Sequence, residues 1–593
     1  MNVLLLDEKD SPDEFPTTNN WELAIDLARA PQSSYANWKE RLGCDVISLH
    51  DFAREADDLA FLRELFQLGS GDLVDRFGID WWDVLSLELL GDLQKIILAT
   101  RLSQRLTQGC QLSCTRLSVA ASAIGAALGR ELNILPSRPS HLLQTVRRYR
   151  QALTRLDRRQ LVQAIEDKID GTCRLRRHVA RQMRTGRREL ILLPSAYSNV
   201  TRTALAFAEL LPDREFLLVS SRRNGRPASL QTNVWHESLT AHFRRVNRGE
   251  MSDLVHAVQQ LLPRLSNTAP EFALAQRIGV MSRFSALLDW GLAHREAWMS
   301  LFQSEDIAAC ISADDANPPT LLPLLLARRR GIPAIACHHG ALNWYFAVKR
   351  NQADFYLSKS EMETDYLRHV CHLPREKLVI GTPYHCGDVS NHPAVGARWL
   401  TFFTEPYGAW GWRTQEVYRE LLPRLIMLAS TCELKLLIKL HPFESVSAIR
   451  RTLRRILGRK AESIAVVDGP TTRELLRATR FAVTVQSSVA LECCERRIPV
   501  FLCGWLRDSH SGYVEQFRRS GIGNVLESPA QIEQIPRLLE NCQNSTPRSA
   551  RLDPNRLDAL LSQRSCAPHQ VCLNPVEDSA DSFAEQQTTL SAS

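Results

Sequence analysis

Short apolar runs alternate with amphipathic stretches along most of the chain. The segments ELILLPS (189–195), DIAACISADD (306–315) and LLIKLHPFE (436–444) each contain an apolar run that is continuous rather than alternating. A strand has this pattern when helices cover both faces of its sheet, because neither face then meets water. Helical stretches separate the runs, which is typical of βαβ units and parallel sheets. The pattern therefore predicts an α/β protein built on Rossmann-like parallel sheets.

The predicted elements fall into two groups. The polar stretch CGDVSNHPAVG (386–396) separates them, so we predict an amino-terminal domain over 1–390 and a carboxy-terminal domain over 396–543. Residues 21–40 have helical composition. From residue 544 the chain is polar and rich in Ser and Gln, and we predict a disordered tail over 544–593. Two doubly wound domains joined by a linker enclose a cleft, where ligands usually bind.

An Arg-rich region at about 140–188 interrupts the first group. It contains TVRRYRQALTRLDRRQLVQAIEDKI and RLRRHVARQMRTGRR, and we expect a helical insertion there. One interpretation is an amphipathic helix pair with a solvated basic face. The other is a surface for anionic lipid head groups or an anionic polymer.

Composition narrows the class of protein. Of the chain's residues, 44% are hydrophobic and 23% are charged, which is typical of a globular protein. With 593 residues the chain is too long to fold around a single hydrophobic core. A net charge of +7 over this length gives no reason to expect nucleic acid. The first residues, MNVLLLDEKD, lack the basic start of a signal peptide. The 15 cysteines form no CxxC pair. We therefore expect a cytoplasmic protein with reduced thiols.

The strand at 436–440 ends in His441-Pro442, because Pro cannot donate to a ladder and fixes φ. His441 then stands at the carboxyl end of a parallel strand, where open α/β sheets bind ligands. A second strand ends in Ser487-Ser488 before a helix, whose free backbone N–H groups favour anions. Taken singly, the histidine can be a surface residue and the serines an N-cap. Together they predict a metal-free phosphate site made of Lys439, His441, Pro442, Ser487, Ser488 and Glu492.

Several acidic residues also stand at predicted strand ends. Asp314-Asp315 follows one strand and precedes a Pro-initiated helix, so an N-cap is the alternative to a catalytic role. Asp7 ends the first predicted strand and Glu405 ends the strand near residue 400. Each of these two can equally be an ordinary strand-end residue. Glu405, in the carboxy-terminal domain, could face a donor molecule.

The segments KLHPFE and QSSVALECCERRIPV resemble the His-Pro and Ser-Ser signatures of bacterial capsule polysaccharide transferases, including polysialyltransferases and Kdo transferases. CDP-glycerol glycerophosphotransferases are similar as well. The resemblance implies a GT-B-like fold, with two Rossmann-like domains facing a cleft. It also implies that His441, Ser487 and Ser488 contact the phosphate of a nucleotide donor.

Two further segments extend this resemblance to about 307–526. CHHGALN resembles a His-Gly element across the cleft that is implicated in acceptor activation, which here gives His339 and Gly340, with His338 as the alternative histidine. GTPYHCGD resembles the Gly-x-Pro element before the interdomain linker. The acidic pair differs from the family pattern, because Ala316 follows it where a glycine is expected. The base therefore stays open between His339 and Asp315.

The predicted function is a glycosyltransferase that uses a nucleotide-activated sugar in bacterial cell-surface polysaccharide synthesis. We expect no cofactor and no essential metal. The expected partners are the nucleotide-sugar donor, a glycan or lipid-linked acceptor, and the inner membrane surface through the Arg-rich helices. The alternatives are a CDP-alcohol phosphotransferase, a UDP-sugar 2-epimerase-like enzyme, and a non-catalytic scaffold for polysaccharide assembly.

Overall fold

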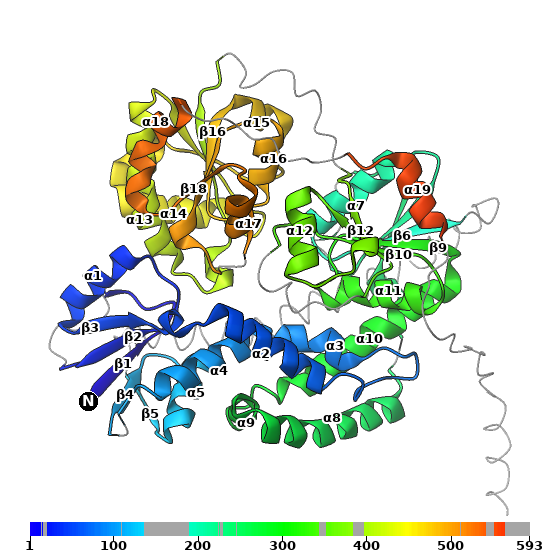
Figure 1. Cartoon of the computed structure of the whole chain (residues 1–593), viewed down its shortest axis with the longest axis horizontal. Helices are drawn as coiled ribbons and strands as arrows, with labels where there is room; N and C mark the ends of the chain where they lie inside the picture. Colours follow the sequence, from blue (N-terminus) through cyan, green and yellow to red (C-terminus); the bar gives the residue numbers. More distant parts are fainter. Residues whose placement is uncertain are drawn as a thin grey trace, which may run out of the picture.

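The computed structural model describes residues 1–12, 15, 20–107, 109–135, 189–222, 225, 229–244, 246–342, 352–383, 396–509, 512–540 and 551–563. Three parallel sheets organise these residues (Figure 1). The predicted Arg-rich insertion at 140–188 lies outside the described residues, as does most of the predicted linker.

The amino-terminal sheet has five strands in the order β3-β2-β1-β4-β5. All its pairs are parallel. The strands are β1 (Asn2–Leu6), β2 (Leu23–Asp26), β3 (Asp45–Ser48), β4 (Gln111–Cys114) and β5 (Leu132–Ile134). The helices of this part are α1 (Gln32–Leu42), α2 (Glu55–Leu68), α3 (Trp81–Leu85), α4 (Leu90–Ser103) and α5 (Val119–Leu128).

The middle sheet has seven strands in the order β12-β11-β10-β9-β6-β7-β8. The strands are β6 (Leu190–Ser195), β7 (Glu215–Ser220), β8 (Val234–Ser238), β9 (Ile307–Ser312), β10 (Ala334–Cys337), β11 (Phe355–Ser358) and β12 (Leu378–Ile380). Every residue of β6 is buried, as its continuous apolar run predicts. The helices are α7 (Ser198–Leu210), α8 (Arg248–Thr268), α9 (Pro270–Arg277), α10 (Arg283–Ser304), α11 (Pro318–Arg329) and α12 (Glu361–His369).

The carboxy-terminal sheet has six strands in the order β15-β14-β13-β16-β17-β18. The strands are β13 (Trp399–Phe403), β14 (Lys435–Lys439), β15 (Ala465–Val467), β16 (Thr479–Thr484), β17 (Val500–Cys503) and β18 (Asn524–Leu526). The helices are α13 (Thr414–Thr431), α14 (Val446–Leu457), α15 (Arg473–Ala478), α16 (Val489–Glu495), α17 (Tyr513–Ser520) and α18 (Ile535–Glu540). The predicted class, α/β with Rossmann-like parallel sheets, is confirmed.

In each sheet the strand order runs outward in one direction and then restarts on the other side of the first strand. The restart falls between β1 and β4, between β6 and β9, and between β13 and β16. At such a point two neighbouring loops leave the carboxyl edge of the sheet in opposite directions. The crevice between them is where open α/β sheets bind ligands.

The amino-terminal half differs from the prediction of one domain over 1–390, because it contains two separate sheets. The helical prediction for 21–40 is wrong at its start, since Leu23–Asp26 is strand β2 and the helix begins only at Gln32. The run LAID is too short to show a period, so tertiary pairing with β1 decides its state.

The tail differs from its prediction as well. Residues 554–562 form helix α19 (Pro554–Ser562), where disorder over 544–593 was predicted. Figure 1 shows α19 against the middle domain, far from α18. Leu552 and Leu557 are fully buried there in the cluster that includes β6 and α7. Three leucines on one face of a nine-residue helix are a weak signal in a polar stretch, and their burial stabilises the segment.

The amino-terminal domain docks onto the carboxy-terminal domain through a buried ion pair. The guanidinium of Arg413 donates to both carboxylate oxygens of Asp26 at 2.8–3.1 Å, and both side chains are at most 2% exposed. Arg413 also donates to the Asp10 carbonyl at 2.7 Å and lies over the Trp38 ring. Burial raises the pKa of Asp26 to about 6, and the nearby Arg413 limits this rise. At neutral pH the pair is therefore ionised.

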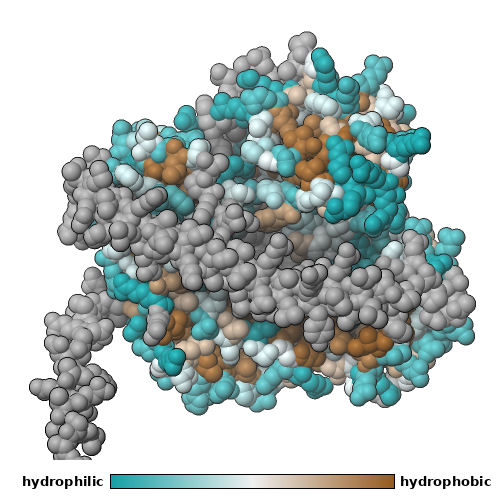
Figure 2. Space-filling view, turned by 180° about the vertical axis from the view of Figure 1, so that it is seen from behind, coloured by the Kyte–Doolittle hydropathy of each residue, from teal (hydrophilic) through white to brown (hydrophobic). Residues whose placement is uncertain are grey.

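None of the described helices is long and apolar enough to cross a membrane. The face shown in Figure 2 carries separate groups of hydrophobic residues among hydrophilic ones.

Replacing Arg413 with Ala leaves the Asp26 carboxylate buried without its cation. We expect this change to lower the free energy of unfolding by about 3–5 kcal/mol, measured by chemical denaturation at neutral pH. Arg424→Ala is the matched control, because its pair with Glu533 is exposed (36% and 51%) and should contribute at most about 1 kcal/mol. An equal loss of unfolding free energy in the two variants would contradict a large contribution of the buried pair to stability.

Candidate functional site

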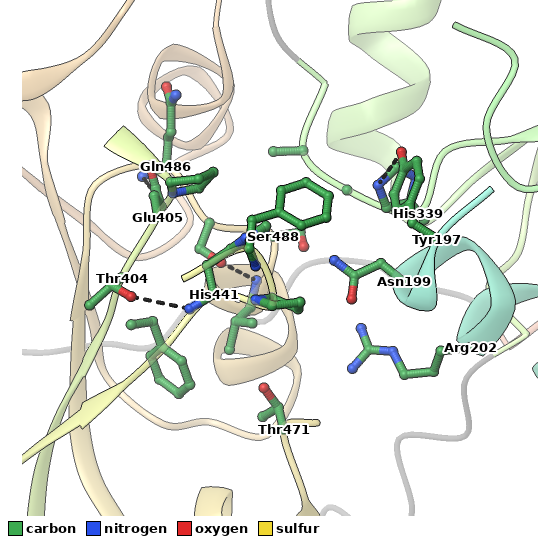
Figure 3. Close-up of a pocket in the computed structure, with 18 of the residues that line it drawn as sticks. Tyr197, Asn199, Arg202, His339, Thr404, Glu405, His441, Thr471, Gln486 and Ser488 are labelled. Carbon is green, nitrogen blue, oxygen red and sulfur yellow. Dashed lines mark hydrogen bonds between the residues drawn. The ribbon is translucent and has the colours of Figure 1, made fainter. Parts of the chain in front are cut away.

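A cavity of about 490 Å³ lies between the middle and carboxy-terminal domains. Its walls come from loops that follow β6, β9 and β10 on one side and β13, β14 and β16 on the other. Both strand-order reversals therefore open onto the same space, since β6 and β9 flank one and β13 and β16 flank the other. The amino-terminal domain contributes the exposed side chain of Glu88. Figure 3 shows the cavity with residues from both domains.

His441 lies in this cavity, two residues past β14. The backbone N–H of Phe443 donates to its Nδ1 at 3.2 Å. In the neutral ring this acceptor role places the proton on Nε2. Burial, together with His339 and Lys439, lowers the pKa of His441 to about 4. At neutral pH His441 is therefore an uncharged N–H donor in a fixed tautomer.

The turn that carries His441 is held by Glu444. This carboxylate accepts from the backbone N–H of His441 at 3.1 Å, from the Tyr418 hydroxyl at 3.0 Å, and from the Thr404 hydroxyl. The Thr404 hydroxyl also accepts from the His441 N–H at 3.2 Å. The position of the imidazole is thus set by the sequence HPFE itself and by a threonine after β13.

Lys439 lines the same cavity but is only 3% exposed. Its ammonium donates to the carbonyls of Leu440 at 2.8 Å and Gly469 at 2.6 Å. Burial lowers its pKa to about 8, and Arg202 adds to this effect. Lys439 therefore joins the loops after β14 and β15 and keeps a positive charge beneath the cavity floor at neutral pH.

Ser487 and Ser488 are half-buried residues of the loop between β16 and α16, and both line the cavity. The Ser487 hydroxyl accepts from the Val489 N–H at 3.4 Å. The Ser488 side chain makes no capping hydrogen bond to α16, and Figure 3 shows it close to His441. The two predicted phosphate-binding elements, His-Pro and Ser-Ser, therefore do come together.

Glu405 stands between these two elements, directly after β13. It is 1% exposed, and its Oε1 accepts from the Gln486 backbone N–H. Burial raises the pKa of Glu405 to about 8, and the carboxyls of Asp508 and Glu444 add to this rise. At neutral pH this group is a neutral carboxylic acid that fixes the entrance to the Ser-Ser loop.

On the opposite wall, three polar side chains form a hydrogen-bonded chain. The Tyr197 hydroxyl donates to Asp314 and lies 3.2 Å from His339 Nε2. His339 Nδ1 lies 3.2 Å from the carbonyl oxygen of Ala313. Because a carbonyl oxygen can only accept a hydrogen bond, Nδ1 carries the proton. In the neutral ring Nε2 is then the unprotonated nitrogen. Burial lowers the pKa of His339 and favours this neutral form.

Aromatic rings join the two walls. Tyr197 contacts the His339 ring at 5.1 Å and the Phe443 ring at 5.7 Å between centroids, and Phe443 contacts His441 at 5.0 Å. Phe443 is 58% exposed although it makes these contacts. The two histidines therefore face each other across one narrow space, with Tyr197 and Phe443 between them.

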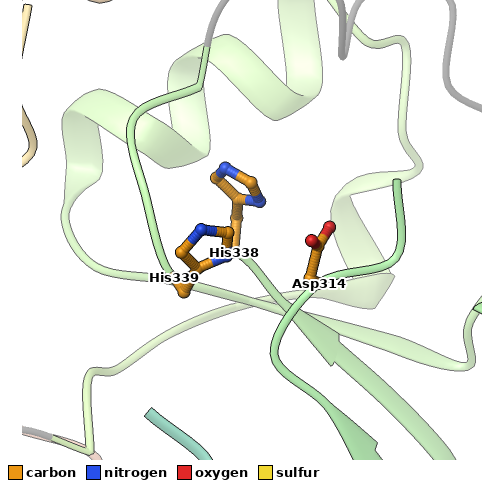
Figure 4. A group of neighbouring side chains, drawn as sticks. All are labelled: Asp314, His338 and His339. Atoms are coloured by element: carbon orange, nitrogen blue, oxygen red, sulfur yellow. The ribbon is translucent and has the colours of Figure 1, made fainter. Parts of the chain in front are cut away.

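Asp314, His338 and His339 could also serve as metal ligands. One ligand atom from each lies within 4.8 Å of the others, and Figure 4 shows the group. The Tyr197 hydroxyl contacts the carboxylate oxygen Oδ2 of Asp314 and the imidazole nitrogen Nε2 of His339. These are two of the atoms that would bind a cation. The arrangement fits a hydrogen-bonded chain in which Tyr197 occupies the central place, and a cation would have to displace that hydroxyl.

The remaining predicted residues lie as follows. His338, Gly340 and Pro442 line the cavity. Asp315, predicted as catalytic, is fully buried and is absent from the cavity wall, which Asp314 lines instead. The sequence alone does not show which of the two adjacent aspartates after β9 points into the cavity, because this depends on the conformation of the loop.

Two further predicted residues lie outside this cavity. Glu492 lies in a separate neighbouring cavity and 3.9 Å from Arg202 rather than beside His441, because α16 leads it away from the Ser-Ser loop. Asp7 follows β1, at the strand-order reversal of the amino-terminal sheet, and pairs with Arg116 at 3.7 Å. It does not line the cavity.

Sequence reasoning missed Tyr197, Asn199 and Arg202. All three line the cavity, with Tyr197 just before α7 and Asn199 and Arg202 in its first two turns. Their signal was a set of polar residues after a buried strand, but polar residues follow many strands of this chain. Only the strand order identifies the loop after β6 as one that faces β9.

No family model matches the chain, and no curated protein matches it in sequence. Among solved structures, a UDP-GlcNAc 2-epimerase from Methanocaldococcus jannaschii is similar at a TM-score of 0.40 and 9% identity, over 63% of this chain and 99% of that one. Spinosyn rhamnosyltransferase SpnG with thymidine diphosphate gives 0.36 and 13%, over 64% and 97%. The wall teichoic acid polymerase TagF gives 0.35 and 11%, over 73% and 95%. All three TM-scores lie below 0.5.

We expect NMR spectra of the histidine side chains to show His441 as a neutral ring with its proton on Nε2 at about pH 6, since burial lowers its pKa to about 4. The His441→Gln variant assigns the signal. A titration midpoint near the unperturbed value of about 6.5 would contradict the buried, oriented imidazole.

Proposed function

We propose that the chain is a glycosyltransferase that moves a sugar from a nucleotide donor to an acceptor hydroxyl. The observation that carries this proposal is the pairing of two kinds of group across one cavity. An oriented N–H donor at His441 and the Ser487-Ser488 hydroxyls lie on one wall, and an unprotonated imidazole nitrogen at His339 lies on the other.

The donor side suits a nucleotide phosphate. His441 Nε2–H and the serine hydroxyls donate to phosphate oxygens, and Lys439 adds positive charge beneath them. Hydrogen bonds to a charged oxygen are about twice as strong as neutral ones. These contacts strengthen as the sugar–phosphate bond breaks and its electron pair moves onto the departing nucleotide, so they favour the transition state.

The opposite wall suits activation of the acceptor. In the transfer, an acceptor oxygen forms a bond to the anomeric carbon while the nucleotide leaves, and the hydroxyl proton must go to a base. His339 lines the cavity, and its Nδ1–H is held by the Ala313 carbonyl, which leaves Nε2 unprotonated beside the Tyr197 hydroxyl. His339 is therefore the base in this proposal, and Asp315 is not, because it is buried away from the cavity.

Tyr197 and Asp314 complete this unit. Burial and the Asp314 carboxylate raise the pKa of the Tyr197 phenol above its ordinary range, so the phenol keeps its proton. That single proton has two acceptors in reach, Asp314 Oδ2 and His339 Nε2. Asp314 thus orients Tyr197 and stabilises the imidazolium that forms after proton transfer.

The wider assignment follows from the resemblance of the motifs to capsule polysaccharide transferases. It comprises a bacterial, cytoplasmic enzyme of cell-surface polysaccharide synthesis, with a glycan or lipid-linked acceptor close to the inner membrane. Neither substrate contact in this scheme requires a cation, so we infer a metal-independent reaction.

A UDP-sugar 2-epimerase-like activity is the second candidate, since three carboxyl groups, those of Glu88, Asp314 and Glu405, line the cavity. An epimerase consumes its nucleotide sugar without any acceptor. A transferase requires the acceptor, and CDP-alcohol phosphotransfer requires a CDP donor in particular.

The test of the proposed donor site is a thermal-shift panel of CMP, CDP, UDP and GDP, measured with and without EDTA. At least one nucleotide should raise the melting temperature, and His441→Ala should weaken its binding about tenfold or more by removing a charge-assisted hydrogen bond. His369→Ala, an exposed histidine of α12 outside the cavity, is the control. No shift with any nucleotide would favour the scaffold alternative, and a shift that EDTA abolishes would overturn the metal-free site.

Tyr197→Phe removes the hydroxyl that joins Asp314 to His339 and keeps the ring contacts. We expect kcat to fall about 100-fold with the dissociation constant of the nucleotide unchanged, because general base catalysis contributes on this scale. Steady-state kinetics and nucleotide titration check the two quantities separately. A loss of nucleotide affinity with kcat unchanged would assign Tyr197 to donor binding instead.

A further inference from the structure

A second cavity of about 600 Å³ adjoins the first. Arg202, His339, Thr471 and Ser488 line both cavities, so the two spaces meet at the histidine that we assign as base. Figure 3 shows Arg202 and Thr471 on the opposite side of His441 from Glu405 and Gln486. The second cavity therefore extends from the reacting end of the first one and not from its far end.

The second cavity is lined by five cations and three carboxylates. Arg202 lies 3.9 Å from Glu492, and Lys359 pairs with Glu363 at 2.8 Å. The three other cations come from three different segments: Arg473 begins α15, Arg496 follows α16, and Arg551 precedes α19. In the part of the chain that the structure describes, none of these three has a carboxylate within 4.0 Å. Three arginines without carboxylate partners around one cavity favour anionic ligands.

The position of Arg551 is fixed by the carboxy-terminal segment. Arg551 forms a parallel bridge with Thr382, and the backbone N–H of Leu552 donates to the Thr382 carbonyl at 3.1 Å. The side chains of Leu552 and Leu557 are fully buried against the middle domain. The return of the chain from the carboxy-terminal domain thus places a guanidinium at the wall of a cavity formed mainly by α7, α15 and α16.

We propose that this second cavity binds the acceptor, and that the acceptor carries carboxylate or phosphate groups that Arg473, Arg496 and Arg551 contact. This inference rests on the proposed transferase function. A guanidinium presents paired N–H donors that match the oxygens of either anion. Because His339 lines both cavities, an acceptor anchored there would present a hydroxyl to this histidine where the two spaces meet, and the donor sugar would lie on the side of the first cavity.

The test uses three probes of equal length in the full chain saturated with its nucleotide. Hexagalacturonate carries carboxylates, a glycerol phosphate oligomer carries phosphates, and maltohexaose is neutral. Binding is measured by isothermal titration calorimetry. At least one anionic probe should bind, its affinity should fall with added salt, and maltohexaose should not bind. The preferred anionic probe distinguishes an acceptor with carboxylated sugars from one with phosphodiesters.

The affinity for the anionic probe should fall about tenfold in each of the single variants Arg473→Gln, Arg496→Gln and Arg551→Gln. Their nucleotide affinity should stay unchanged. Arg556→Gln is the control, because Arg556 is an exposed residue of α19 outside this cavity. Three outcomes would overturn the inference. Maltohexaose could bind as tightly as the anionic probes, nucleotide could displace the probe, or none of the three arginine changes could affect binding of the probe. Failure of both anionic probes to bind would also overturn it. The proposed function fails separately, if no nucleotide binds.

Discussion

The order of strands in two parallel sheets is the constraint on which the site depends. In the middle sheet the chain restarts between β6 and β9, and in the carboxy-terminal sheet between β13 and β16. Each restart leaves a crevice at the carboxyl edge, and the two crevices face one cavity. Residues that are far apart in sequence, such as Tyr197 and Asp314, are brought into hydrogen-bond contact by this topology alone.

The chemistry of the site follows from burial within that frame. Desolvation lowers the pKa values of His339 and His441 and raises that of Glu405, so all three groups are neutral at pH 7. A neutral imidazole is a base or a donor according to which nitrogen is protonated. The Ala313 carbonyl makes His339 an acceptor at Nε2, and the Phe443 N–H makes His441 a donor at Nε2. Two backbone contacts therefore give two equal side chains opposite roles.

Much of this could be predicted from the sequence, and the reasons for success and failure are physical. Continuous apolar runs predicted most buried strands. The placement of His441, Ser487 and Ser488 in one cavity could also be predicted, because a polar residue at the end of such a run must lie at the sheet edge. The first sheet was predicted poorly, since LAID at β2 is too short to show a period. Tyr197 was missed, and Asp315 was preferred to Asp314, because both questions depend on strand order and loop rotation. The burial of Leu552 and Leu557 in an otherwise polar tail was equally invisible.

In the proposed complex, a nucleotide phosphate lies between the His-Pro and Ser-Ser loops and faces His339. This placement can be tested by a crystal structure of the chain soaked with the nucleotide that raises its melting temperature most. We expect phosphate oxygens within hydrogen-bond distance of His441 Nε2 and of a hydroxyl of Ser487 or Ser488, with the arginine-lined cavity left open for the acceptor. A nucleotide bound instead among Arg473, Arg496 and Arg551 would contradict it.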